Sequence, residues 1–332
     1  MIRSHLWIVT LTTKQPLVDI LNPAALSLLI DSGRTGYQRQ GVCASGPMDS
    51  FAYEMANMLL GIPANSSVIE VCGEGFIMQA LTPIKVCVTG ANGRCNLNGE
   101  VIPMWRPFDL DANDVLQIEL TGEGYRYYIG FNAQLDSQVA YGSYSTVMRE
   151  RLGGIHGNGM PLTLGDRLQG TLTKPIENNF TSRQSLMLQQ LQKSVYSSKS
   201  IRLIPGSQFD QFDRLAWHRL LSSKYRIEQH SNRMGIRLHG PSVSNRTFTM
   251  RSEGLTMGSV QVPADGQPIV LMADRQTLGG YPKIANVAMV DLPFLSQRPP
   301  GTSIMFAEID LETSRNEWRL RQYMIKQIRA SL

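Results

Sequence analysis

Short apolar runs separated by turn-forming residues recur along most of the chain. Gly, Asn, Asp and Pro lie between these runs, which are residues 84–89, 115–120, 125–131, 201–204, 247–251, 269–273 and 303–309. Runs of this length with turn residues at their ends are typical of β-strands. Helical segments are too few to connect parallel strands, so the pattern predicts a mainly β fold built from barrels.

One segment shows a clear helical period. In residues 49–60, apolar side chains recur at i, i+3, i+4 and i+7 and therefore share one helix face: Ala52, Met55, Ala56 and Leu59. Asp49 can cap this helix, Gly61 can end it, and Pro63 prevents its continuation.

Two further helices are predicted in the second half of the chain. One covers 210–221 with Asp210 as its cap. The other fills the C-terminal tail, where Leu320, Met324 and Ile328 form an apolar seam. We expect the tail to pack against a barrel or a partner protein.

The segment 181–200 has the composition of a connection between domains. It is rich in Ser, Gln and Lys, and strand patterning resumes only at Ile201. A chain of 332 residues exceeds the roughly 100–200 residues of a single domain. We therefore expect an N-terminal domain over 1–195 and a C-terminal domain over 196–332.

The net charge of +5 is concentrated in the tail. Residues 312–332 hold five basic and two acidic side chains, which gives +3 there and leaves +2 for the rest. This distribution argues against a basic face for nucleic acid. The apolar runs are far shorter than the ~20 residues that span a bilayer. No secretory signal is recognisable either, so we expect a cytoplasmic protein.

The cysteines and histidines point to no metal or redox site. The four cysteines include no C-x-x-C pair and are interpreted as reduced thiols, with Cys87 in a strand core. The histidines lack metal-ligand spacing, so no metal site is predicted. The sequence also lacks a phosphate-binding loop of the G-x-x-x-x-G-K-[ST] type and a G-x-S-x-G nucleophile motif, which makes Ser45 a poor nucleophile candidate.

Residues 31–57 form the first of two polar, glycine-rich stretches. Asp31 and Arg34 lie among glycines in a predicted tight loop, and the guanidinium of Arg34 suits a carboxylate or phosphate. The chain then enters the helix at Asp49, and Asn57 continues the polar edge. Asp31, Arg34 and Asn57 are candidate substrate-binding residues. Asp49 is a candidate for proton transfer, although helix capping alone explains its position.

Residues 230–282 form the second stretch, which is denser in polar side chains. Glu253 and Asp274 are candidates for proton transfer or for orienting nearby arginines. Long amides beside strand-like runs suit a planar amide substrate, and arginines suit its carboxylate. The substrate-binding candidates are Asn232, Arg233, Gln261, Gln267, Arg275, Gln276 and Tyr281. Turn and ion-pair roles explain any one of them, but their clustering favours a shared small-molecule site.

Several long segments, in the same order, resemble the KipA family, also described as allophanate hydrolase subunit 2 or biotin-dependent carboxyltransferase-like. They are DSGRTGYQRQGVCASGPMDSFAYEMANMLLG, NGEVIPMWRPF, SNRMGIRLHGP and SEGLTMGSVQVPADGQPIVLMADRQTLGGYPK. The resemblance extends over about residues 25–310. It implies two cyclophilin-like β-barrel domains, and it assigns the two polar stretches to different barrels. A site that both stretches share would then lie at the domain junction or at a partner interface.

The family includes the C subunit of prokaryotic 5-oxoprolinase. The resemblance favours this member of the family. It implies two partner subunits, one KipI-like and one LamB/YcsF-like. It also implies ATP with Mg at the level of the complex, used to open 5-oxo-L-proline to L-glutamate. Arg34 and Arg233 would then bind anionic groups while Glu253 or Asp274 assists proton transfer.

Two alternatives stay open. One is a biotin-dependent carboxyltransferase acting on urea or a related amide, although this chain has no A-M-K-M biotin-attachment motif. The other is a regulatory protein that binds a KipI-like kinase inhibitor.

Overall fold

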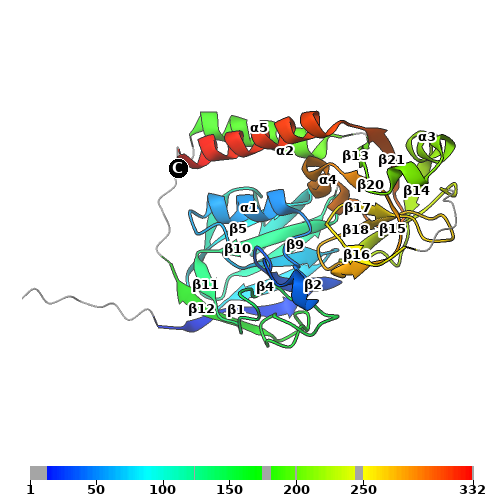
Figure 1. Cartoon of the computed structure of the whole chain (residues 1–332). Helices are drawn as coiled ribbons and strands as arrows, with labels where there is room; N and C mark the ends of the chain where they lie inside the picture. The colour runs from blue at the N-terminus through cyan, green and yellow to red at the C-terminus, as the bar shows by residue number, and fades with distance from the viewer. Residues whose placement is uncertain (1–12, 123, 174–180, 199, 244–249, 331–332) are drawn as a thin grey trace, which may run out of the picture.

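The N-terminal half of the chain forms two β-sheets (Figure 1). The structure, a computed structural model, describes residues 13–122, 124–173, 181–198, 200–243 and 250–330. The first sheet has the strand order β11 (Ala133–Leu135), β12 (Arg167–Leu172), β1 (Gln15–Asn22), β4 (Phe76–Ala80), β9 (Val115–Leu120), β6 (Gly93–Leu97) and β7 (Glu100–Ile102). The second has the order β2 (Leu26–Ile30), β3 (Val68–Cys72), β10 (Arg126–Phe131), β5 (Ile84–Gly90) and β8 (Pro107–Leu110). Both sheets contribute side chains to one apolar core, so they pack face to face.

Strand β10 is buried on both of its faces, in agreement with the run of uncharged residues that follows Arg126. Tyr127 and Ile129 face the shared core, whereas Tyr128 packs against α1 (Ser50–Leu59). Gly130 allows this helix to approach, since a Cβ there would lie 2.9 Å from Cδ1 of Leu60. Helix α1 therefore covers the outer face of the second sheet.

The helix predicted over 49–60 is confirmed as α1. The Asp49 carboxylate accepts a hydrogen bond from the backbone N–H of Ala52 at 2.9 Å and so caps the first turn. The predicted apolar face is fully buried. It packs between the second sheet and a layer of two longer helices.

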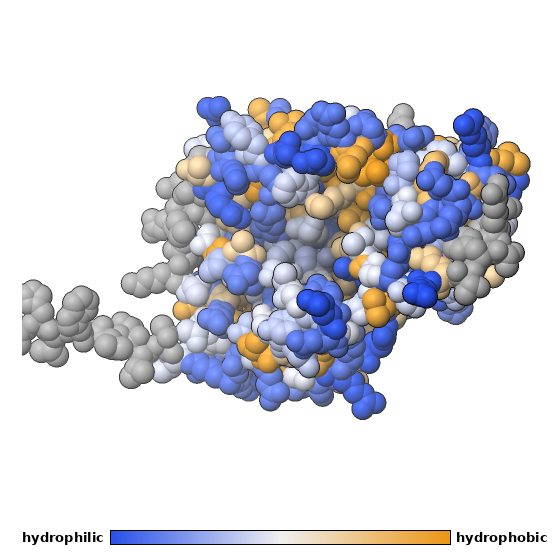
Figure 2. Space-filling view, in the orientation of Figure 1, coloured by the Kyte–Doolittle hydropathy of each residue, from blue (hydrophilic) through white to orange (hydrophobic). Residues whose placement is uncertain are grey.

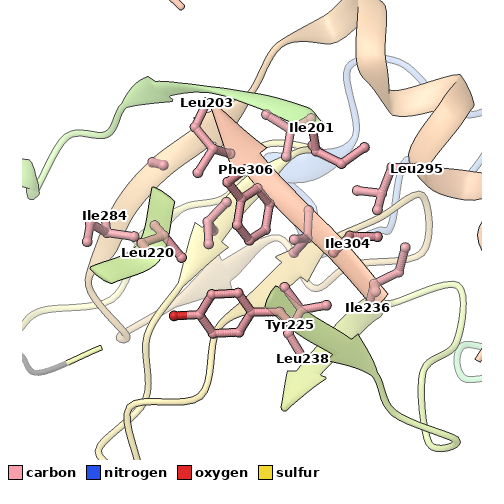
Figure 3. Close-up of a cluster of buried hydrophobic side chains, with 14 of the residues drawn as sticks. Ile201, Leu203, Leu220, Tyr225, Ile236, Leu238, Ile284, Leu295, Ile304 and Phe306 are labelled. Atoms are coloured by element: carbon pink, nitrogen blue, oxygen red, sulfur yellow. The ribbon is translucent and has the colours of Figure 1, made fainter. Parts of the chain in front are cut away.

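The C-terminal half forms a closed barrel, as predicted. Its strand order is β13 (Ile201–Pro205), β20 (Lys283–Val287), β17 (Ser259–Gln261), β18 (Ile269–Leu271), β15 (Gly235–His239), β14 (Lys224–Ile227) and β21 (Ser303–Glu308). The parallel pairing of β21 with β13 closes the barrel. Figure 3 shows its interior, where the rings of Tyr225 and Phe306 lie 5.9 Å apart among aliphatic side chains.

The structure tests the strand predicted over 247–251 only at its last two residues. Residues 247–249 lie outside the described residues, and residues 250–251 belong to no strand. The short strands β16 (Glu253–Gly254) and β19 (Leu278–Gly279) pair beside the barrel. Short 3₁₀ helices lie at η1 (Gln38–Gln40), η2 (Phe209–Gln211) and η3 (Met289–Asp291).

The polar segment 181–200 is mostly helix rather than an irregular connection. Helix α2 (Ser182–Tyr196) begins with a capping box between Thr181 and Gln184, and it buries Leu188, Leu191 and Val195. No helix was predicted here from the sequence, because polar residues separate the few apolar positions of its buried stripe. The strands pair only within β1–β12 or within β13–β21, while a boundary at residue 195 stays a prediction.

The C-terminal helix α5 (Leu311–Ala330) returns to the N-terminal half and lies along α2 (Figure 1). The predicted seam is only partly correct. Ile328 is buried and Met324 packs against the same cluster, but Leu320 is 60% exposed and Ile325 takes the buried position. The other predicted helix begins later than expected, at α3 (Arg214–Ser222), because Asp213 rather than Asp210 caps it.

The two halves are joined by residues that cross between them. Met48 belongs to the N-terminal half, yet its side chain lies in the barrel core. Helix α4 (Leu292–Ser296) follows the barrel strands and is followed by Gln297, which bonds to Asp49. Figure 2 shows that hydrophilic residues predominate on this face of the molecule, which is hollowed between the halves. No helix of the described residues combines the length and apolarity needed to cross a membrane.

Candidate active site at the junction of the two halves

The two polar stretches identified in the sequence meet at this junction. Ser45 donates a hydrogen bond from its hydroxyl to Oδ1 of Asp274 at 2.7 Å. Arg233 donates from Nη2 to the carbonyl of Gly46 at 2.6 Å, and the Cys43 thiol lies 3.6 Å from the carbonyl of Ala273. The stretches therefore share one polar surface across the two halves.

Arg233 lies at the centre of this polar contact region and is almost fully buried. Its Nε and Nη2 each lie 2.9 Å from Asp274 oxygens, and Nη1 bonds to Glu70 at 2.5 Å. Burial disfavours its charge, but the carboxylates of Asp274 and Glu70 outweigh burial and raise the pKa of Arg233. These contacts make Arg233 a positioning residue that joins the halves. Its predicted contact with substrate stays a prediction.

Glu70, a partner of Arg233, was not among the residues singled out from the sequence. It lies in the middle of β3, where every residue is buried. Its Oε2 accepts hydrogen bonds from the backbone N–H of Met48 at 2.9 Å and from the Tyr128 hydroxyl at 2.7 Å. A charged residue inside the apolar run Val68–Cys72 needs a buried partner. Its position in that run could therefore have marked Glu70 from the sequence alone.

Ser45 adopts a conformation that few non-glycine residues take. Its φ is +55°, and it is followed by Gly46 with φ +94°. The neighbouring loop approaches closely, since a Cβ on Gly33 would lie 2.7 Å from the carbonyl oxygen of Ala44. Left-handed backbone at a non-glycine residue is stored strain that the surrounding fold must hold. Here it directs the half-buried Ser45 hydroxyl at Asp274.

Asp31 and Arg34 lie close to this surface but hold a loop of their own half. Asp31 accepts hydrogen bonds from the Ser143 and Ser145 hydroxyls and from the backbone N–H groups of Gly33 and Tyr144. Arg34 donates to backbone carbonyls of residues 140 and 145. Its Nη1 is buried and has no hydrogen-bond partner among the described residues. Burial lowers the pKa of Arg34, with Asp31 opposing the shift.

Asp49 lies in a second buried network, which reaches the barrel. Its Oδ2 accepts hydrogen bonds from the Tyr196 hydroxyl at 2.8 Å and from Nε2 of Gln297 at 2.7 Å. Its backbone N–H donates to the Tyr128 hydroxyl, which in turn bonds to Glu70 and so links the two networks. Burial raises the pKa of Asp49 to about 6, although the hydrogen bonds oppose the shift.

This shift predicts a pH dependence of stability. The folded state binds the Asp49 proton more tightly than the unfolded state, whose pKa is near 3.8. Protonation therefore stabilises the fold, and this contribution is lost as the pH rises from about 4 to about 6. Two pKa units correspond to on the order of 3 kcal/mol.

Asp49→Asn retains a capping side chain and should flatten this part of the curve of unfolding free energy against pH. Asp210→Asn, at an exposed position, is the control, and equal slopes in both variants would contradict the prediction.

Asn57 and the amides of the second stretch make local contacts. Asn57 donates to the carbonyls of Ala64 and Ser66 and so holds the turn after α1. Gln267 pairs with both backbone groups of Gly240, and Gln261 donates weakly to the carbonyl of Tyr281 at 3.4 Å. The substrate-binding roles of these three side chains stay predictions.

The remaining candidates differ in how accessible they are. Glu253 pairs with Lys283, which lowers the pKa of Glu253, and it accepts from Gln208 at 2.9 Å. Arg275 donates to the backbone carbonyls of residues 255, 272 and 273, and burial lowers its pKa. Gln276 is half-buried, whereas Asn232 and Tyr281 are exposed. Of the residues of this stretch that the structure describes, Asp274 and Arg233 are hydrogen-bonded in the buried network with Glu70 and Ser45.

The described residues contain no group of three or more His, Cys, Asp or Glu side chains placed to hold a metal ion. The four cysteines are buried and unbridged. Burial raises the pKa of Cys43 to about 11, so this thiol beside Ala273 stays protonated at neutral pH. The ionisable chemistry of the junction therefore rests on its carboxylates.

Curated relatives align with nearly the whole chain. The 5-oxoprolinase C subunit of Haemophilus influenzae is 33% identical over 315 residues, which cover 94% of this chain and 98% of the relative. The 5-oxoprolinase C subunit of Escherichia coli is 32% identical over 298 residues, covering 89% and 92%. The urea amidolyase of Saccharomyces cerevisiae is 28% identical over 94% of this chain, but the match covers only 18% of that protein.

Solved structures share the fold as part of larger chains. TTHA0988 superposes with a TM-score of 0.75 and 30% identity over 88% of this chain, which corresponds to 55% of that chain. The urea amidolyase of Kluyveromyces lactis gives a TM-score of 0.83 over 96% of this chain and 20% of its own, and its 24% identity supports the fold alone. The family described as carboxyltransferase domain, subdomain A and B, matches residues 40–308. With that match over most of its length, the chain belongs to the carboxyltransferase domain family.

Proposed function

We propose that this chain is the C subunit of an ATP-dependent 5-oxoprolinase, a complex that opens 5-oxo-L-proline to L-glutamate. The observation that carries the proposal is the alignment with two proteins named as the 5-oxoprolinase C subunit, which covers 98% and 92% of their lengths. The urea amidolyase match covers 18% of that protein. Agreement over the whole length of a relative is stronger support than agreement with one segment of a larger enzyme.

Lactam opening requires groups that move protons while the ring amide is attacked and its nitrogen leaves. We assign this role to Asp274, whose Oδ1 already accepts a hydrogen bond from the half-buried Ser45 hydroxyl. Arg233 holds the carboxylate through two hydrogen bonds, and Glu70 holds Arg233. Glu253 is a weaker candidate, because its bonds to Lys283 and Gln208 hold it apart from the Ser45–Asp274–Arg233 network.

The described residues contain no recognisable Mg·ATP motif. The chain has no G-x-x-x-x-G-K-[ST] phosphate-binding loop, and its described part has no group of three or more His, Cys, Asp or Glu side chains placed to hold a metal ion. We therefore assign no step of nucleotide chemistry to residues of this chain. In the proposed complex, ATP with Mg acts at the level of the complex, and the two partner subunits are KipI-like and LamB/YcsF-like.

Reconstitution tests the proposal directly. The three purified subunits are mixed with 5-oxo-L-proline and Mg·ATP, and glutamate is measured over time. We expect glutamate only when this chain and both partners are present. The proposal fails if the full mixture yields no glutamate, or if omitting this chain leaves the rate unchanged.

A biotin-dependent carboxyltransferase is the second candidate, favoured by the family match and by the 28% sequence identity to the urea amidolyase of Saccharomyces cerevisiae. The same preparation would then transfer a carboxyl group from a separately carboxylated biotin carrier to urea. Carboxyl transfer without glutamate formation from 5-oxo-L-proline would favour this alternative.

A further inference from the structure

The loop of residues 31–34, which follows β2, packs backbone to backbone against residues 44–46, the Ser45 turn. Gly33 has φ +87°, and a Cβ there would lie 2.7 Å from the carbonyl oxygen of Ala44 and 3.0 Å from that of Ser45. A side chain at position 33 could be accommodated only if the turn moved. Glycine is therefore what permits this close approach.

Hydrogen bonds fix this loop to the Ser45 turn and to a third segment, residues 140–145. The backbone N–H of Arg34 donates to the carbonyl of Ala44 at 2.7 Å. The guanidinium of Arg34 donates from Nε and Nη2 to two backbone carbonyls of the third segment, at 3.0 and 2.7 Å. The Asp31 carboxylate accepts hydrogen bonds from two hydroxyls and one backbone N–H of the same segment. The loop therefore links the turn to a separate part of the N-terminal half.

Ser45 depends on these neighbours for its conformation. Its φ of +55° lies in the left-handed region, which a non-glycine residue keeps only where the surrounding structure holds it. The turn is held from two sides, because the backbone N–H of Cys43 donates to Glu150 at 3.0 Å while the carbonyl of Ala44 accepts from Arg34. The direction of the Ser45 hydroxyl is thus set by contacts outside the turn.

We propose that Gly33 and Arg34 are positioning residues that hold the Ser45 hydroxyl against Asp274. Both act through the backbone of the turn, a role that differs from the substrate contact predicted for Arg34 from the sequence. The inference rests on the proposed function, in which Asp274 exchanges a proton beside Ser45. A displacement of about 1 Å can lower a rate about a hundredfold, so the loop affects kcat rather than substrate binding.

Two alanine substitutions test the contact of Gly33 with the turn. Gly33 and Gly36 both have left-handed backbone, with φ +87° and +95°, but a Cβ on Gly36 would meet no described residue within 4 Å beyond its chain neighbours. Alanine is similarly strained at both positions, and only Gly33→Ala displaces the turn. In the reconstituted complex we expect Gly33→Ala to lower kcat for glutamate release by about a hundredfold with little change in KM. Gly36→Ala should keep the kcat of the wild type, and a wild-type kcat in Gly33→Ala would overturn the proposal.

A double variant shows whether the effect passes through the Ser45 hydroxyl. If Gly33 acts by placing this group, adding Gly33→Ala to Ser45→Ala should lower kcat little further, because the group that it places is gone. A merely structural role of Gly33 would lower kcat by the same factor in both backgrounds. That result would overturn the positioning role.

Arg34→Lys is the second variant, and it also serves if thermal unfolding shows that Gly33→Ala does not fold. Lysine keeps the charge but cannot reproduce the two-point bond of the guanidinium to segment 140–145. We expect kcat to fall while KM for 5-oxo-L-proline is kept, and the fall should again vanish in the Ser45→Ala background. A raised KM with an unchanged kcat would assign Arg34 to the substrate and overturn its positioning role.

Crystal structures of the isolated full-length variants separate this inference from the proposed function. In Gly33→Ala we expect the distance from Oγ of Ser45 to Oδ1 of Asp274 to increase from 2.7 Å to beyond about 3.5 Å, where a hydrogen bond is lost. Gly36→Ala should keep the bond. A bond kept in both variants overturns the positioning even if the complex makes glutamate. If the wild-type complex makes no glutamate, the proposed function fails, and the two structures still decide whether Gly33 holds Ser45 in place.

Discussion

Replacing Arg233 with methionine is expected to lower the free energy of unfolding by about 3–5 kcal/mol, the usual cost of removing one partner from a buried ion pair. Glu70 and Asp274 are each less than a tenth exposed, and both take their cation from this guanidinium. Without it, two carboxylates stay in a medium that solvates them poorly. The measurement is urea-induced unfolding followed by fluorescence at neutral pH.

Arg237→Met is the matched control for this prediction. Arg237 lies nearby on β15, but it is exposed, so its loss should change stability by less than about 0.5 kcal/mol. A triple variant that adds Glu70→Gln and Asp274→Asn to Arg233→Met should recover part of the loss, because the unpaired charges are gone. Equal stability of Arg233→Met and Arg237→Met would show that the buried pair does not hold the halves together.

The second large effect concerns Asp274. In the reconstituted complex, Asp274→Asn is expected to reduce the rate of glutamate release by about a hundredfold or more, the usual contribution of a positioned acid–base group. The amide keeps the size of the carboxylate but cannot take a proton from Ser45 or from water. We expect kcat to fall while KM for 5-oxo-L-proline changes little.

Two comparisons separate this role from a structural one. Asp210→Asn removes an exposed carboxylate and should leave the rate unchanged. Ser45→Ala leaves the Asp274–Arg233 pair intact and removes only the hydroxyl at 2.7 Å, so it should lower kcat without a large change in unfolding free energy. If Asp274→Asn kept the kcat of the wild type, the proposed proton transfer by Asp274 would be excluded.

Elements with strong local periodicity could be predicted from the sequence. Helix α1 begins at its predicted cap, Asp49, and the face predicted from the i, i+3, i+4, i+7 pattern is buried. Helix α2 was missed, although Thr181 and Gln184 carry the capping-box spacing. Its polar composition hid a stripe of three buried residues, because a helix covered on one side needs only that stripe to be apolar.

For the site, the sequence by itself determined which residue types were available and which stretches held them. It marked Asp274 and Arg233 in one stretch and the glycine-rich turn around Ser45 in the other. Only the tertiary structure decided their partners. Arg233 pairs with Glu70, 163 residues away, and contacts Ser45, 188 residues away. Local patterns carry no information about such distant pairs. The packing of the two halves brings these charges together, and burial at the junction makes Glu70 and Asp274 depend on the guanidinium of Arg233, with which both are paired.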